Sequence, residues 1–209
     1  EVVGIYISGH PLDDFKIEMK NFCNGTITSF ENLELLINKE ITFGGVITDV
    51  EHRVSRHGKG WATFTIEDYT NNHEFKIFGE EYLKFRHFLM LNNFVYVRSI
   101  VRDGWINRET GKKGAPRIQF NNFQLLHDVI NAYAKKLSIQ LSLNGINEVI
   151  IDELQELFKM HKGNNSLNFV IYDDEDSIKV NLKSRKQKIK ISQELLSHLD
   201  SRKVFYKLN

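Results

Sequence analysis

The sequence has almost no cysteine and almost no net charge. Its single cysteine, Cys23, has no partner for an internal disulfide, and one thiol is too few for a cysteine-based metal site. A reducing compartment, the cytoplasm, is therefore expected. The 28 Lys and Arg residues against 27 Asp and Glu leave a formal charge of +1. That balance excludes a dominant polyanion-binding field but leaves room for local basic patches.

Long apolar runs are also missing. The run that begins at Phe88 stops at Asn92, far short of the about 18 apolar residues that a membrane-spanning helix needs. We therefore expect no membrane partner. The chain opens on Glu1-Val2-Val3 with no basic segment and no cleavage site, so no secretory signal is predicted. Because the first residues begin in mid-pattern, we expect a segment of a longer protein.

What is present is typical of a globular protein. Hydrophobic residues make up 41% and charged residues 26% of the 209 residues, a length that fits one large or two small domains. The periodicity changes near residues 40 and 128, which divides the chain into 1–40, 41–128 and 129–209. In the first part, apolar residues spaced three and four apart after Pro11 predict a short helix, and 1–40 is interpreted as a short helical segment.

Residues 41–128 alternate with a period of two, which predicts β-strands. Strands are expected at about 41–50, 61–67, 73–78, 94–101 and 117–126, with a short helix at 80–88. Three strands, a helix and two strands is the order of the OB-fold, a five-stranded Greek-key barrel. Gly44-Gly45 in the long first strand supplies the bend that such a barrel needs.

Residues 129–209 mix the two periods again. A linker helix is expected at 128–134, a longer helix at 146–160 and a third from Ser192 to Leu199. Strands are predicted at 137–141, 167–172, 178–182 and 204–208. The predicted fold is therefore mainly β plus α+β: an OB barrel followed by a small α+β domain.

Two loops of the predicted barrel are rich in cations and tryptophan. They are the loops that border the nucleic-acid groove of OB-folds. Phosphates attract cationic side chains, and unpaired bases stack on flat aromatic rings. The simpler alternative is that these are solvated loop charges with tryptophans packed as lids. With a lysine on the neighbouring strand face, the candidate nucleic-acid-binding residues are Arg53, Arg56, His57, Lys59, Trp61, Lys76, Trp105, Arg108, Lys112, Lys113 and Arg117.

No catalytic, metal or cofactor site is predicted. The eight histidines are scattered without carboxylate or histidine partners at ligand spacing. The acidic turn at 173–176 lacks the glycine and the distal glutamate of a calcium loop. Gly58-Lys59-Gly60 is too short for a phosphate-binding P-loop. The chain is therefore interpreted as a binding module.

The first segment resembles a known family. Residues 4–12, Gly-Ile-Tyr-Ile-Ser-Gly-His-Pro-Leu, closely resemble the GxYxxGHP segment of the bacterial replicative DNA polymerase III alpha subunit. Residues 43–47, Glu67-Asp68, 75–78 and 117–120 continue the similarity in order, so that it covers essentially the whole chain. The resemblance implies a C-terminal fragment: the end of a helical region, the OB domain, and a region that contacts the tau subunit of the clamp loader.

The resemblance also carries functional expectations. In that family the OB barrel is thought to contact the single-stranded template, so single-stranded DNA, tau and other replisome subunits are the implied partners. The basic loop residues and Trp61 are the positions carried over. The family's catalytic aspartates and clamp-binding motif lie upstream of this segment, and no residue here matches them.

For the second domain, the closing apolar residues are the candidate contact with a partner. They are Leu195, Leu199, Val204 and Phe205. The basic run at 183–190 could steer an acidic partner toward them. The alternative is that these apolar residues simply fill a small core.

Two other interpretations stay open. An anticodon-type OB module that binds tRNA would continue into a large catalytic domain, whereas here an α+β unit follows. A pure protein-interaction scaffold is compatible with the small net charge. Salt-dependent binding of single-stranded DNA would separate such a scaffold from a nucleic-acid-binding module.

Overall fold

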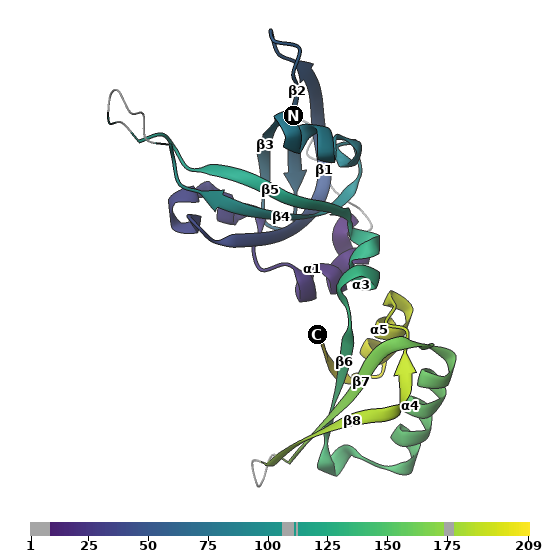
Figure 1. The fold of residues 1–209 in the computed structure, drawn as a ribbon. Coiled ribbons are helices and arrows are strands. Elements are labelled where there is room, and N and C mark those ends of the chain that lie inside the picture. Colours follow the sequence, from purple (N-terminus) through teal and green to yellow (C-terminus); the bar gives the residue numbers. More distant parts are fainter. Residues whose placement is uncertain (1–8, 106–110, 112, 174–177) are drawn as a thin grey trace. The chain divides into compact units, whose positions relative to one another are not determined.

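The computed structural model describes residues 9–105, 111, 113–173 and 178–209. The chain divides into two compact units, Glu1–Val129 and Ile130–Asn209 (Figure 1). No helix in the described parts of the chain is long and apolar enough to cross a bilayer. Each unit has its own sheet and its own hydrophobic core.

The first unit is built on one antiparallel sheet with the order β3-β2-β1-β4-β5. A short helix, α2 (Gly79–Phe85), lies between the third and fourth strands. This is the order of elements that the sequence predicts, and the mainly β class is confirmed. The strands are β1 (Glu40–Val54), β2 (Gly60–Glu67), β3 (Asn72–Phe78), β4 (Phe94–Arg102) and β5 (Arg117–Leu125).

The long strand β1 serves both halves of the sheet. Its residues from Glu40 to Val46 pair with β4, and those from Val46 to Val54 pair with β2. The crossing requires glycine, because a Cβ on Gly45 would lie 2.4 Å from the side chain of Ile66. The predicted Gly-Gly bend is therefore where the strand changes partners.

The OB-fold sheet predicted from the sequence is present, but hydrogen bonds do not close it into a complete barrel. Among the described residues no ladder of hydrogen bonds joins β3 to β5, so the sheet stays open between these two edges. Side chains bridge the region instead: the amide N of Phe120 on β5 donates to Glu81 Oε2 on α2 at 3.1 Å, and the ring centroids of Phe120 and Phe75 on β3 are 5.9 Å apart. The open edge matters for the site, because a groove lies along it.

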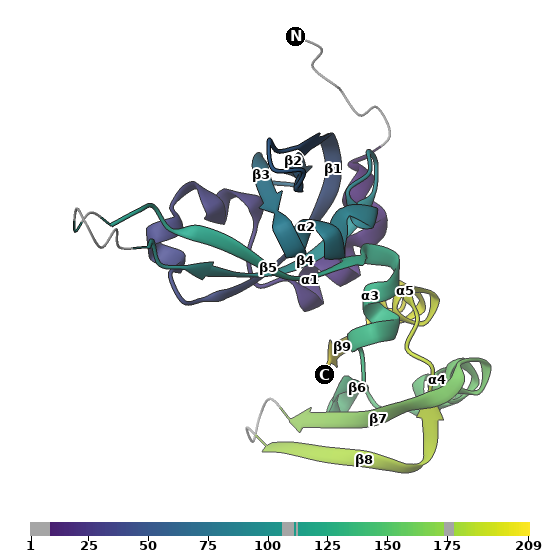
Figure 2. The ribbon, with the colours of Figure 1, turned by 45° about the horizontal axis from the view of Figure 1, so that its top comes forward.

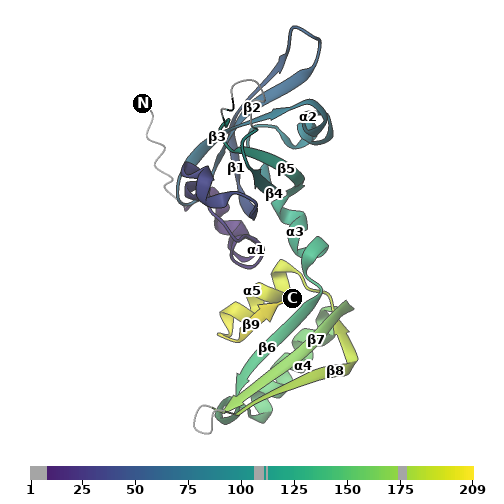
Figure 3. The ribbon, with the colours of Figure 1, turned by 60° about the vertical axis from the view of Figure 1, so that its left-hand side comes forward.

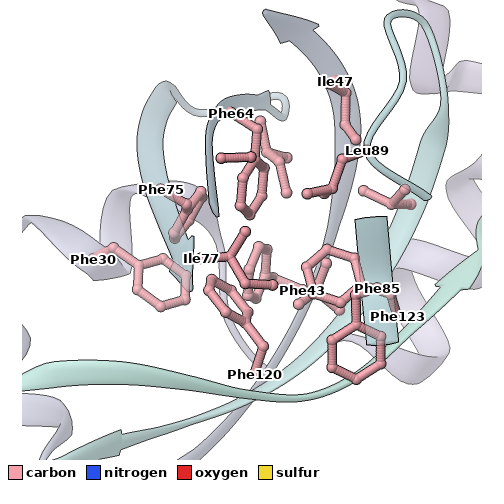
Figure 4. Close-up of a cluster of buried hydrophobic side chains, with 14 of the residues drawn as sticks. Phe30, Phe43, Ile47, Phe64, Phe75, Ile77, Phe85, Leu89, Phe120 and Phe123 are labelled. Atoms are coloured by element: carbon pink, nitrogen blue, oxygen red, sulfur yellow. The ribbon is translucent and has the colours of Figure 1, made fainter. Parts of the chain in front are cut away.

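The core of the first unit is a cluster of phenylalanines (Figure 4). Phe75 lies at its centre, with ring centroids 5.2 Å from Phe30, 5.5 Å from Phe43 and 5.6 Å from Phe64. Each such ring, fully buried, contributes about 1.5–3 kcal/mol of hydrophobic stabilisation. The inward-facing residues of β2 and β3 are thereby fixed, and so is the face that points outward.

The N-terminal segment is helical, as predicted. A 3-10 turn (Pro11–Phe15) leads into α1 (Lys16–Phe22), and two further turns cover Ile27–Glu31 and Leu33–Leu36. Ile27 and Phe30 are buried in the core of the sheet. The amide N of Ile27 also donates to Asp68 Oδ2 at 2.8 Å, which ties the segment to the β2–β3 turn. Residues 4–8 of the segment that carries the family resemblance lie outside the described residues.

The second unit is a small α+β fold, as predicted. Its sheet has the order β8-β7-β6-β9, with β6 and β7 parallel and the other pairs antiparallel. The helix α4 connects the parallel pair (Figure 3). It packs on the sheet, where the ring centroids of Phe158 and Phe169 are 6.1 Å apart. The helix α3 (Leu126–Tyr133) spans the boundary between the two units. The elements of the second unit are β6 (Lys136–Ser142), α4 (Glu148–Met160), β7 (Lys162–Asp173), β8 (Ile178–Ile189), α5 (Gln193–Ser201) and β9 (Phe205–Leu208).

The hairpin of β7 and β8 is longer than the sequence suggests (Figure 2). Strands were expected at 167–172 and 178–182, whereas β7 begins at Lys162 and β8 continues without a break to Ile189. The basic run at 183–190 therefore lies largely on a β-strand at the edge of the sheet.

Candidate nucleic-acid interface

The outer face of β1, β2 and β3 carries the candidate site. Ladder register places Arg53 opposite Trp61, and Trp61 opposite Phe78. Alternation along the strands buries Phe64 and Phe75 in the core and turns this row outward. Three side chains suited to a nucleotide therefore stand side by side on adjacent strands.

We call Arg53, Trp61 and Phe78 the aromatic platform. The rings of Trp61 and Phe78 stack with centroids 5.4 Å apart and planes inclined by 18°. The guanidinium of Arg53 lies 5.3 Å from the Trp61 ring, within cation–π range. Phe78 remains 56% exposed, so the platform is open to a further ring. An unpaired base can extend this stack.

Phe78 is not among the binding residues that the sequence predicts. The signal was present, because Phe75 and Ile77 occupy the inward positions of β3 and leave Lys76 and Phe78 facing outward. A large exposed aromatic residue on a strand face beside a tryptophan is a stronger indication of a stacking surface than a loop tryptophan alone.

Carboxylates partly neutralise the cations on this face. Arg53 donates to Glu51, and Lys76 lies 3.6 Å from Glu74. The hydrogen bond from Arg53 holds the pKa of the Glu51 carboxyl below its usual range and raises the pKa of Arg53. Both pairs are exposed, so a phosphate can compete for either cation at little cost. Contacts through this face should therefore be weak and sensitive to salt.

The β1–β2 loop supplies cations that are not paired with carboxylates among the described residues. Arg56, His57 and Lys59 are exposed, and none forms a salt bridge in the described part of the chain. The loop is a tight turn in which Ser55 N donates to the Lys59 carbonyl at 2.8 Å. Gly58 takes a φ of 72°, which permits the reversal. The turn holds these cations two to five residues before Trp61.

The β4–β5 loop is described only in part, since Arg108 and Lys112 lie outside the described residues. Trp105 is 70% exposed and is therefore not packed as a lid. Lys113 Nζ lies 2.9 Å from Asp103 Oδ2, and this bond lowers the pKa of the Asp103 carboxyl. Arg117, the first residue of β5, is exposed.

A groove of about 540 Å³ follows the open edge of the sheet. Lys76 and Phe78 line it from β3, and Arg117 and Ile118 line it from β5. It therefore brings together two candidates that are 41 positions apart in the sequence. Phe78 belongs both to this groove and to the aromatic platform, so the two features are continuous.

Other chemistries find little support. Burial raises the pKa of the Cys23 thiol to about 12, so this cysteine is a poor nucleophile at neutral pH. Within the ranges that the structure describes, no three His, Cys, Asp or Glu side chains come together as a metal site. The acidic turn at 173–176 falls largely outside those ranges.

The four apolar residues expected to meet a partner do not share one environment. Leu195 and Leu199 on α5 are fully buried, and Val204 is 6% exposed, so all three belong to the core of the second unit. Helical spacing identifies an apolar face but does not tell whether it meets a core or a partner. Phe205, at the start of β9, is 69% exposed and is the member that a partner can reach.

Comparison with known families agrees with this geometry. Residues 41–131 match the family model described as OB-fold nucleic acid binding domain. The first unit therefore contains an OB-fold of the nucleic-acid-binding class. Residues 137–209 match the model described as DNA polymerase III alpha subunit, C-terminal domain.

Curated relatives extend this agreement over most of the chain. The DNA polymerase III subunit alpha of Buchnera aphidicola subsp. Acyrthosiphon pisum is 25% identical over 84% of this chain, and that of Aquifex aeolicus is 26% identical over 83%. The chain is similar over most of its length to the bacterial DNA polymerase III alpha subunit, and its second unit matches the C-terminal domain of that subunit. It spans 15% and 14% of the length of these two relatives.

Among solved structures, the aspartyl tRNA synthetase from Entamoeba histolytica aligns over 82% of this chain and 31% of that chain. The TM-score is 0.31 and the identity 11%. Similarity at this level supports no conclusion about function.

Proposed function

We propose that the first unit binds single-stranded DNA as part of a replicative DNA polymerase in the bacterial cytoplasm. The observation that carries the proposal is the aromatic platform, in which Trp61 and Phe78 stack with Phe78 exposed and Arg53 on the Trp61 ring. A flat stack at the surface of an OB-fold suits an unpaired base and excludes a paired one.

The cations around the platform suit the phosphates on either side of a stacked base. Arg56 and Lys59 lie in the β1–β2 loop, and Lys76 and Arg117 line the groove at the open edge. If about four phosphates are neutralised, the logarithm of the affinity should fall against the logarithm of the salt concentration with a slope of about −3. The first unit carries more acidic than basic residues, which favours modest affinity.

The test is Phe78→Ala in the whole chain. Removing a stacking ring should weaken binding of an oligo-dT probe by about 1–3 kcal/mol, measured by fluorescence anisotropy. Phe205→Ala is the matched control, because it removes another exposed phenylalanine, at 69% against 56% for Phe78, from the second unit. Equal binding of wild type and Phe78→Ala would refute stacking on this platform.

The same assay separates the alternative interpretations. A preference for oligo-U over oligo-dT of equal length would favour an RNA-binding module of the anticodon type. No salt-dependent binding of either strand would favour a protein-interaction scaffold. We expect oligo-dT to bind at least as well as oligo-U, and both to bind better than duplex DNA.

We further propose that the second unit contacts the tau subunit of the clamp loader. The support is the match of residues 137–209 to the C-terminal domain of the alpha subunit, together with the exposed ring of Phe205. Exposed aromatic residues are frequent anchors of protein interfaces. Calorimetric titration with tau should show weaker binding for Phe205→Ala than for Leu83→Ala, an exposed apolar residue of the first unit. Equal affinities would place the contact elsewhere.

A further inference from the structure

The second unit has a positively charged groove of its own. Its volume is about 490 Å³, and it lies where the end of α4, the start of β7 and the last third of β8 meet. We call it the lysine groove. It is lined by Lys159, Lys162, Gly163, Lys186, Gln187 and Lys188.

Irregular pairing between β7 and β8 creates this groove. Lys162 and Asn165 both register with Ile189, so the start of β7 is bulged. Further along, Ser166 pairs with Lys188 and Asn168 with Lys183, so four residues of β8 stand opposite one of β7. Bulges of this kind turn side chains away from the regular ladder and are frequent near binding sites.

The fold holds the bulged strands close together. The amide N of Lys190 donates to the carbonyl of His161 at 2.7 Å, and Gln187 N donates to Ser184 Oγ at 3.2 Å. At Gly163 a Cβ would lie 2.5 Å from the backbone N of Lys190, so only glycine fits there. The lysines are therefore brought together by specific backbone geometry.

The charge of the groove is not compensated. No carboxylate lines it, and its four lysines form no salt bridge among the described residues. Residues 130–209 carry 13 Lys and Arg against 10 Asp and Glu, whereas residues 1–129 carry 15 against 17. The basic excess of the whole chain thus belongs to the second unit. Ammonium groups gathered in this way repel one another and attract a polyanion.

The lining indicates which polyanion. It contains no aromatic and no large apolar side chain, so it offers neither a surface for base stacking nor the anchors that dominate protein interfaces. Lysines are point charges on flexible stems, which suit evenly spaced phosphates. We propose that the lysine groove binds the phosphate backbone of nucleic acid, without preference for base or strandedness. This contact is independent of the aromatic platform.

A double substitution in the whole chain tests the proposal. Lys186→Gln with Lys188→Gln removes two groove cations, and Lys179→Gln with Lys207→Gln removes two exposed lysines of the same unit outside it. Each phosphate contact with a single strand contributes about 0.7 to the magnitude of the slope of log affinity against log salt concentration. The slope of the groove variant, which lacks two lysines, should therefore be smaller by about 1.4. Near about 0.1 M salt this variant should bind oligo-dT about tenfold more weakly. Duplex DNA should lose about as much.

The control pair should stay within about twofold of wild type, and circular dichroism should show both variants folded. Equal losses in the two variants would reduce the effect to net charge and overturn the proposal, as would unchanged binding in the groove variant. Tighter binding of a poly-glutamate peptide than of an oligonucleotide of equal charge would reassign the groove to an acidic protein.

The two nucleic-acid proposals fail in different ways. If Phe78→Ala loses the preference for single strands but keeps the full salt slope, the aromatic platform provides that preference. If the groove variant keeps that preference but its affinity depends less steeply on salt, the lysine groove provides the lost phosphate contacts.

Discussion

The two units differ in the side chains that they present to the solvent. Residues 1–129 contain 12 of the 15 phenylalanines and both tryptophans, together with a small excess of acid. Residues 130–209 contain three phenylalanines, no tryptophan and an excess of base. Most phenylalanines of the first unit are buried, but Phe78 and Trp105 are exposed, so this unit presents flat rings at its surface. The second unit presents one exposed ring among its described residues, Phe205, and the cations of the lysine groove. A near-neutral chain conceals this division, because the two excesses almost cancel.

The cores differ in the same way. Phenylalanine rings in stacked, tilted and edge-to-face contacts dominate the core of the first unit, whereas aliphatic side chains from α4, α5 and the sheet fill most of the second. Because the cores are separate, a substitution in one should leave the stability of the other unchanged. A single core substitution can therefore test whether the two units unfold independently.

The largest effect is expected for Phe75→Ala. Phe75 is 2% exposed and lies among several other rings, so its removal should cost about 3–5 kcal/mol of unfolding free energy. Both tryptophans lie in the first unit, so urea unfolding followed by tryptophan fluorescence reports that unit alone. Phe78→Ala, on the surface, should cost less than about 1 kcal/mol. A parallel loss in a calorimetric transition of the second unit would show that the units unfold together.

A smaller loss of stability, confined to the second unit, is expected for Gly163→Ala. The added methyl group would meet the Lys190 backbone, and relieving that contact should cost the second unit about 1–3 kcal/mol. Gly145→Ala is the control in the same unit, since its new Cβ would meet only Ser142, at 3.9 Å. Tryptophan fluorescence should be unaffected by either change. Equal stability of the two variants would mean that the close approach at Gly163 is not required.

The sequence predicted the order of elements well, for physical reasons that are local. Alternation placed the five strands of the first unit, and Gly44-Gly45 marked the bend where β1 changes partners. Local patterns do not tell whether the edges of a sheet meet, so the gap between β3 and β5 was missed. The same limit applies to Leu195 and Leu199, whose spacing fits a core face and a partner face equally.

The candidate site was predicted in part. The sequence selected Arg53, Trp61 and Lys76, but their carboxylate partners and the role of Phe78 depend on register between strands. In the second unit, the basic run was recognised while the bulges that fold part of it into a groove were not. A single sequence does not tell which residues far apart along the chain pair with one another.

The smallest effect concerns Glu18 of the first unit. Its Oε2 atom is buried without a hydrogen-bond partner in the described residues, and burial raises the pKa of its carboxyl. Because a raised pKa favours the protonated acid, Glu18 becomes more destabilising as the pH rises above its ordinary value and through the raised one. Glu18→Gln should therefore raise the melting temperature at pH 7 and leave it nearly unchanged at pH 4. A melting temperature that rises at pH 4 but not at pH 7 would mean that the carboxylate is well solvated.

The most direct measurement of the central claim uses Trp61 itself as the probe. Trp105→Phe leaves Trp61 as the only tryptophan of the chain. Titration of this variant with oligo-dT should quench tryptophan fluorescence to a plateau that follows binding seen by anisotropy, because a base stacks on the platform. Duplex DNA should bind through charge and leave the fluorescence nearly unchanged. Oligo-dT binding without a change in Trp61 fluorescence would contradict the account, because it would place the single strand away from the aromatic platform.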